Sequence, residues 1–256
     1  PLSRGQPGPE GSWNNELVKL LLIRHGQSTN NVLTAAGHPF RGRSADPELT
    51  ALGLRQSLRL TEAFTGGLAP RPTVLVSSPM VRAVQTAAPL ADELDLPIVV
   101  DTCAYEVGGV YAGEPGSPAP DRGAAASRLL AVSERVELPD DVGEQGWYHR
   151  GAHVEEQEEA QERGRTLYAS LLSRGTHDRD VIALVCHEWI IQYLIRAALH
   201  LSNPLGSPDP WFIVFNTATV LIETGRPKPG PFEGTGTSAL WWVNRHDHLD
   251  RAEVTH

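Results

Sequence analysis

The chain has 256 residues, enough for one large α/β domain or two small ones, and its 40% hydrophobic and 21% charged residues suit a globular protein with a sizeable core. Its net charge is −9 and it has no basic block, which argues against nucleic acid and anionic membranes as partners, because both require a concentrated positive surface. No apolar run approaches the ~20 residues of a membrane-spanning helix. The sequence carries no signal for the oligomeric state.

The N-terminal segment is expected to be disordered. Residues 1–15 are rich in Pro, Gly and Gln and lack the apolar core of a signal peptide. Residues 16–256 are expected to form a single domain. The two cysteines, Cys103 and Cys186, lie in or beside apolar stretches, which favours reduced buried thiols and a cytoplasmic location.

Short apolar runs predict the strands, and amphipathic patterns between them predict helices. The expected strands are residues 17–24, 73–78, 98–101, 181–187, 218–223 and 240–244. The expected helices are residues 50–60, with Thr50 as N-cap, 80–94, 188–199, and one whose first turns and solvated face are the acidic run at 155–165. Alternating strands and helices predict an α/β fold, a three-layer α/β/α sandwich with a mainly parallel sheet.

Two segments depart from this alternation. Residues from about 112 to 152 open with a Gly/Pro-rich stretch, pass through a short helical pattern at about 124–136, and end in an aromatic cluster. This segment is interpreted as an insertion that caps the site. Residues 226–237 are rich in Pro and Gly and are expected to form a loop before the last strand.

Polar side chains follow four of the expected strands. Arg24 and His25 end the first, and Arg82 lies in the first turns of the helix after the second. Glu106 follows the third strand and His187 ends the fourth. Parallel strands bring their carboxyl ends to one edge of the sheet, so these side chains should converge there. Two arginines, two histidines and a carboxyl suit phosphoryl transfer, with a charge clamp, a nucleophile and a proton donor.

These motifs resemble those of the histidine phosphatase superfamily, in its phosphoglycerate-mutase-like branch. Arg-His-Gly-Gln-Ser, Ser-Ser-Pro-x-x-Arg-Ala-x-Gln-Thr-Ala, Glu-x-x-Gly and a second histidine occur in the family's order and approximate spacing. The segment that begins Asp46-Pro-Glu-Leu-Thr also resembles the family. The resemblance covers about residues 17–223, and the ordered set is far more specific than a lone Arg-His-Gly.

The resemblance implies a phosphomonoester hydrolase of the histidine acid phosphatase type, acting on a small-molecule phosphomonoester. His25 would become phosphohistidine, and Glu106 would protonate the leaving oxygen and then activate water. The residues expected to bind phosphate are Arg24, Gln27, Ser28, Asn31, Arg82 and His187. No metal and no other cofactor is expected, because these cations supply the positive charge. The cap residues Trp147, Tyr148, His149 and Arg150 are expected to touch the rest of the substrate.

Several alternatives stay open. Glu188, next to His187, is a rival proton donor, since another branch of the superfamily places its acid there. His149 and His153, with Glu155 nearby, are a weak candidate for a metal site because no further ligand follows at a convincing spacing.

Two other functions also stay open. Glycolytic mutases carry Glu-Arg-x-Tyr-Gly around the acid and an arginine pair in the following insertion. This chain has Glu106-Val-Gly-Gly instead, and its arginines there, Arg122, Arg128 and Arg135, are scattered. This departure argues against phosphoglycerate mutase activity. A catalytically silent binding module is disfavoured because every matched position is intact.

Overall fold

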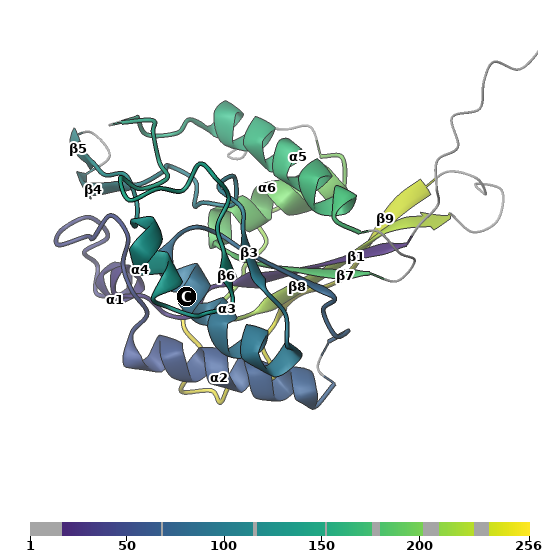
Figure 1. Cartoon of the computed structure of the whole chain (residues 1–256). Helices are drawn as coiled ribbons and strands as arrows, with labels where there is room; N and C mark the ends of the chain where they lie inside the picture. The colour runs from purple at the N-terminus through teal and green to yellow at the C-terminus, as the bar shows by residue number, and fades with distance from the viewer. Residues whose placement is uncertain are drawn as a thin grey trace, which may run out of the picture.

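The computed structural model describes residues 17–67, 69–114, 117–151, 153–175, 180–201, 210–227 and 236–256. A seven-stranded sheet in the order β6-β3-β2-β7-β1-β8-β9 has helices on both faces (Figure 1). Strands β1, β2, β3, β6 and β7 pair in parallel, whereas β8 and β9 are antiparallel. The predicted α/β fold with a mainly parallel sheet is therefore confirmed. The strands are β1 Val18–Arg24, β2 Val74–Ser77, β3 Ile98–Val100, β4 Tyr111–Glu114, β5 Ser117–Pro120, β6 Val136–Glu137, β7 Val181–Cys186, β8 Thr219–Pro227 and β9 Gly236–Arg245.

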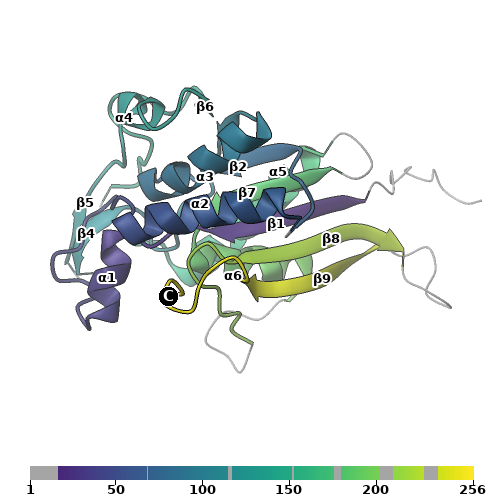
Figure 2. The same cartoon turned by 90° about the horizontal axis from the view of Figure 1, so that it is seen from below.

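The helices form two layers, one on each face of the sheet (Figure 2). They are α1 Thr29–Ala35, α2 Ala51–Thr65, α3 Val81–Leu94, α4 Ala126–Leu130, α5 Gln157–Ser173 and α6 Glu188–Ala198. Helices α2 and α3 pack together against one face, and α5 and α6 against the other. On β1, Leu21 and Ile23 join the core beneath α2 and α3, whereas Leu20 and Leu22 join the core beneath α5 and α6. Alternate side chains of one buried strand therefore serve both cores.

The structure differs from the sequence prediction at several elements. Helix α1, the β4–β5 hairpin and the two-residue strand β6 were not expected. The expected helix at 124–136 was wrong beyond its first part, because α4 ends at Leu130 and Val136 instead begins β6, which pairs with β3. The expected loop at 226–237 was also partly wrong, since β8 extends to Pro227 and β9 begins at Gly236. Residues 1–15, predicted to be disordered, lie outside the described residues.

The state of the cysteines and the length of the helices can be compared with the sequence predictions. Cys103 and Cys186 are both free thiols, with Cys186 buried and Cys103 half-buried. Among the described residues, no helix is both long and apolar enough to span a bilayer.

Two glycines hold the loop after β1 tightly against the start of α2. The N-cap of α2 is Thr50, as predicted, and the Thr50 side chain accepts a hydrogen bond from the backbone N–H of Gly53 (3.1 Å). A Cβ on Gly53 would lie 2.1 Å from the carbonyl oxygen of Gln27, and a Cβ on Gly26 would lie 2.6 Å from the carbonyl oxygen of Gly53. Only residues without a side chain allow this backbone approach, which fixes the position of the loop.

We therefore expect Gly53→Ala to destabilise the protein by about 1–3 kcal/mol through overpacking, although alanine normally favours a helix over glycine. The matched control is Gly66→Ala at the end of the same helix, where the nearest atom to a Cβ is 3.5 Å away. Urea unfolding of both variants tests this. Equal free energies of unfolding for the two variants would contradict the prediction that the Gln27 backbone leaves no room for a side chain at residue 53.

Candidate active site

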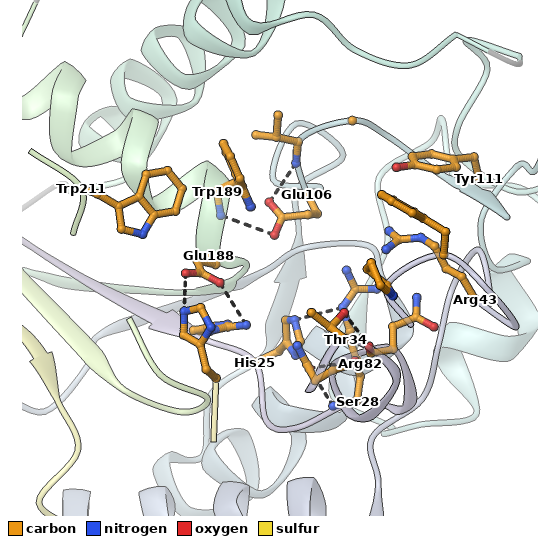
Figure 3. A pocket seen from close by; sticks show the side chains of 18 residues that line it. His25, Ser28, Thr34, Arg43, Arg82, Glu106, Tyr111, Glu188, Trp189 and Trp211 are labelled. Carbon is orange, nitrogen blue, oxygen red and sulfur yellow. Dashed lines mark hydrogen bonds and ion pairs between the residues drawn. The ribbon is translucent and has the colours of Figure 1, made fainter. Parts of the chain in front are cut away.

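The carboxyl ends of β1 and β7 open into a cavity of about 580 Å³. Figure 3 shows side chains converging on it from the end of β1, α1, the start of α3, the segment after β3 and the start of α6. The predicted site residues that line it are Arg24, His25, Ser28, Asn31, Arg82 and Glu106, together with the rival acid Glu188. The sequence motifs therefore meet in one place, as the parallel sheet predicts.

His25 is held in one tautomer. Its Nδ1 lies 2.6 Å from the carbonyl oxygen of Gly26, which can only accept, so Nδ1 carries the proton. Its Nε2 accepts a hydrogen bond from Nε of Arg82 at 3.1 Å, so Nε2 carries the lone pair. Burial, together with the charges of Arg82 and Arg24, lowers the pKa of His25 well below its usual value. The imidazole is thus neutral near pH 7, and its unprotonated Nε2 is hydrogen-bonded to the arginine that lines the cavity.

The two predicted arginines are buried, with relative exposures of 4% for Arg24 and 6% for Arg82. Nη2 of Arg24 pairs with Glu188 at 3.1 Å, and its Nη1 donates to the carbonyl oxygen of Val214 at 2.6 Å. Arg82 lies 3.9 Å from Asp46, and burial lowers its pKa to about 10, so it stays charged. Arg24 Nε and Arg82 Nη1 are buried with no hydrogen-bond partner among the described residues. Two buried cations with unused donors have the chemistry to bind an anion.

His187 lies beside His25 but does not line the cavity. The two ring centroids are 5.1 Å apart, and the His187 side chain is fully buried. Its Nε2 is 2.7 Å from Oγ of Ser78, whereas its Nδ1 has no partner within the described part of the chain. Burial, then the charge of Arg82, lowers the pKa of His187. It is therefore a neutral ring behind the nucleophile candidate.

The polar residues after His25 divide into two groups. Ser28 and Asn31 form the capping box of α1, in which Oδ1 of Asn31 accepts from both N and Oγ of Ser28 at 2.9 Å. Both side chains line the cavity. Gln27 does not, because its Oε1 accepts a hydrogen bond from Thr50 at 2.7 Å and its backbone N donates to Gln56. The structure therefore places the Gln27 side chain against α2, away from the predicted phosphate site.

Glu106 and Glu188 differ in what they bind. The Glu106 carboxylate accepts from the backbone N–H groups of Val107 (2.8 Å), Ile190 (3.3 Å) and Trp189 (3.4 Å). Burial nevertheless raises its pKa above the usual value. Glu188 instead pairs with Arg24 and with His256. The Nε2 atom of His256 lies 2.8 Å from Oε1 of Glu188. Glu106 is therefore a carboxyl held by uncharged backbone donors, whereas Glu188 is held by a cation.

The four expected cap residues lie elsewhere. Trp147 and Tyr148 are buried, at 4% and 3% exposure, in the core beneath α3, and they pack on the ring of Tyr105. His149 and Arg150 are exposed. None of the four lines the cavity, and neither does any other described residue of 112–152. Glycines before and within this segment, with positive φ, let these large rings pack inward rather than toward the site.

The residues considered for a mutase activity and for a metal site also lie away from the cavity. Arg122, Arg128 and Arg135 do not line it, and Arg128 pairs with Glu48. The Glu155 side chain is buried in a two-point ion pair with Arg163 (2.6 Å). Among the described residues, no group of three or more His, Cys, Asp or Glu side chains is arranged to hold a metal ion.

Several lining residues were missed by sequence reasoning. Arg43 lies above the ring of Tyr111, 5.0 Å from its centroid, and its charge acts on Arg82. Arg43 lies shortly before Asp46, where the segment that resembles the family begins, and this position was a signal that could have identified it. Trp189 directly follows Glu188, whereas Trp211 belongs to a segment without a local motif. The full list of missed residues also contains Asn30, Thr34, Pro39, Phe40, Val107, Gly108 and His256.

The fold and the site together define an α/β protein in which two buried arginines and two neighbouring histidines lie at the carboxyl edge of the sheet. The family model of the histidine phosphatase superfamily (branch 1) matches residues 20–229. The chain belongs to this superfamily.

Known proteins agree with this assignment. A glucosyl-3-phosphoglycerate phosphatase from Mycolicibacterium vanbaalenii is 36% identical over 85 residues, 33% of this chain and 34% of that protein. The match thus spans about a third of the relative's length. A phosphoserine phosphatase mutant from Entamoeba histolytica, solved with phosphoserine, has a TM-score of 0.57 and 20% identity, covering 91% of this chain and 99% of that one. A mycobacterial glucosyl-3-phosphoglycerate phosphatase complexed with VO3 has a TM-score of 0.55 and 21% identity, covering 88% and 98%. The solved structures share the fold.

Proposed function

We propose that the protein is a metal-independent phosphomonoesterase that hydrolyses a small phosphorylated metabolite through a phosphohistidine at His25. The observation that carries this proposal is the fixed tautomer of His25, whose unprotonated Nε2 lies 3.1 Å from Arg82 Nε. A neutral imidazole with a directed lone pair is an activated nucleophile, and adjacent cations attract the phosphate it would attack. The phosphatase names of the relatives support the same reaction class.

In the first step, Nε2 of His25 attacks phosphorus and the bond to the leaving oxygen breaks. Arg24 and Arg82, which line the cavity, bind the equatorial oxygens, on which the negative charge is spread. Nε of Arg24 and Nη1 of Arg82 have no hydrogen-bond partner among the described residues, which supports this role. His187 lies behind His25 and does not line the cavity, so we do not assign it to the phosphate. Glu106, whose raised pKa favours its protonated form, gives its proton to the leaving alcohol.

In the second step, the Glu106 carboxylate takes a proton from water, which attacks the phosphorus and breaks the N–P bond. His25 and Glu106 then return to their starting protonation states, so no external acid or base is consumed. The arginines supply the positive charge that a divalent metal provides in other phosphoryl-transfer enzymes. The two free thiols fit a reducing compartment, so we assign this activity to the cytoplasm.

Phosphate release from a broad panel of sugar phosphates, phosphorylated acids, nucleotides and aryl phosphates tests the proposal. We expect turnover of some of these compounds, with a rate that a strong chelator leaves unchanged. Loss of activity with chelator, restored by a divalent ion, would contradict metal independence. A folded protein that is inactive on the whole panel would contradict the phosphatase assignment, and interconversion of phosphoglycerates would then identify the mutase alternative.

A further inference from the structure

The outer part of the cavity is bounded by aromatic rings on two sides. Trp189 and Trp211 lie on one side and Tyr111 on the other, with Glu106 between them (Figure 3). Phe40 also lines the cavity. The two tryptophans are 42% and 40% exposed, although large apolar side chains of the described residues are mostly buried. Water-exposed rings at the mouth of a site gain free energy when a ligand covers them.

Trp189 is fixed next to the proposed proton donor. It lies in the first turn of α6, and its backbone N–H donates to Oε2 of Glu106 at 3.4 Å. A leaving oxygen that accepts a proton from Glu106 must lie within hydrogen-bond distance of that carboxyl. The group attached to this oxygen therefore leaves the phosphate site past Trp189.

Trp211 extends the same wall. Its ring centroid is 4.6 Å from that of Trp189, with an interplanar angle of 69°. This edge-to-face contact leaves ring surface of both side chains toward the cavity that they line. The opposite side is not purely apolar, because the Arg43 guanidinium lies over Tyr111 and forms no ion pair within the described part of the chain. Both kinds of surface attract a flat ring, because tryptophan offers a ring face and the guanidinium of Arg43 offers a planar cation.

We propose that the substrate is the phosphate monoester of an alcohol that carries a flat aromatic ring, and that Trp189 and Trp211 form its binding wall. The inference rests on the proposed phosphatase function and adds the chemical class of the leaving group. Stacking on aromatic side chains selects rings by their flat surface rather than by hydrogen bonds, so the wall distinguishes aromatic from puckered or polar alcohols.

The test compares kcat/KM for benzyl phosphate, cyclohexylmethyl phosphate and phosphoserine. The first two alcohols are similar in size and acidity, but only benzyl alcohol is flat. We expect benzyl phosphate to be the best substrate, and Trp211→Ala to lower its kcat/KM about 10-fold and to reduce the benzyl-to-cyclohexylmethyl ratio. The matched control is Trp241→Ala, which removes a tryptophan that is 52% exposed on β9 and lines a separate depression with Lys19. This control should keep the parent ratio.

Equal kcat/KM values for the flat and puckered esters, or equal effects of Trp211→Ala and Trp241→Ala, would overturn the inference. Binding without turnover separates this result from failure of the proposed function. Calorimetric titration with benzylphosphonate and cyclohexylmethylphosphonate should show tighter binding of the flat compound and loss of that preference in Trp211→Ala. If no ester is hydrolysed, the phosphatase proposal fails, and these titrations still decide whether the wall selects a flat ring.

Discussion

Replacing His25 by alanine is expected to reduce phosphomonoester turnover by about 10⁴-fold or more, because the proposed nucleophile is then lost. The structure supports this role with one ring nitrogen fixed on Gly26 and the other directed to Arg82. Steady-state assays on a substrate found in the panel measure the loss. Rapid quenching of the parent enzyme with radiolabelled substrate should trap label that is acid-labile and alkali-stable, as expected for an N–P bond.

His187→Ala is the paired variant for this experiment. It removes a neighbouring imidazole, whose centroid is 5.1 Å away, but leaves the nucleophile in place. We expect it to slow turnover while label still accumulates on His25, whereas His25→Ala should accumulate none. Persistent turnover in folded His25→Ala, or label mapped to His187, would contradict the phosphohistidine mechanism.

The central part of the site could be predicted because its residues follow the strands directly. Arg24 ends β1 and His187 follows β7, so their positions depend on a sheet edge that the apolar runs already define. Arg82 is the second residue of α3, which follows β2 closely, so its position depends on the same edge. The order of strands brings these residues together, although they are far apart in sequence.

The residues that surround the rest of the substrate could not be predicted in this way. Trp147 and Tyr148 were expected in the cap because they end the irregular segment at 112–152, where their rings could stack on the substrate. In the structure their rings fill the core beside Tyr105, and a Cβ on Gly109 would lie 2.1 Å from Oη of Tyr148. The cavity wall is instead built by Arg43 and Trp211, which come from segments outside the cap. Whether an aromatic side chain in a loop packs inward depends on long-range contacts that local patterns do not encode.

Glu106→Gln is expected to affect esters according to how much their leaving group needs a proton. For alkyl phosphates, kcat/KM should fall by about 10²–10⁴-fold, because the departing alkoxide is strongly basic. For p-nitrophenyl phosphate the fall should be far smaller, since its phenolate leaves without protonation. The parameter kcat/KM covers only the steps up to the first irreversible one, so it reports formation of the phosphoenzyme and not its later hydrolysis. A burst of p-nitrophenolate should appear in the variant, because its glutamine cannot activate water.

The pH dependence provides a second readout of the same group. Burial raises the pKa of Glu106, so its protonated form persists to higher pH than that of an ordinary carboxyl. Since the first step uses the protonated form, kcat/KM for alkyl esters should decline as pH rises through this pKa, and Glu106→Gln should lose that part of the decline. Ionisation of the substrate is common to both proteins and does not affect the comparison.

Glu188→Gln distinguishes the two carboxyl groups that the sequence left as rivals. Glu188 pairs with Arg24 at 3.1 Å and so holds its guanidinium in place, and its replacement should let Arg24 move out of position and lower kcat/KM for alkyl and p-nitrophenyl esters alike. A leaving-group-dependent loss in Glu188→Gln, with an equal loss on both esters in Glu106→Gln, would reverse the assignment. The expected contrast follows from geometry, because Glu106 is bound to uncharged backbone donors, whereas Glu188 positions a cation that the proposed phosphate site requires.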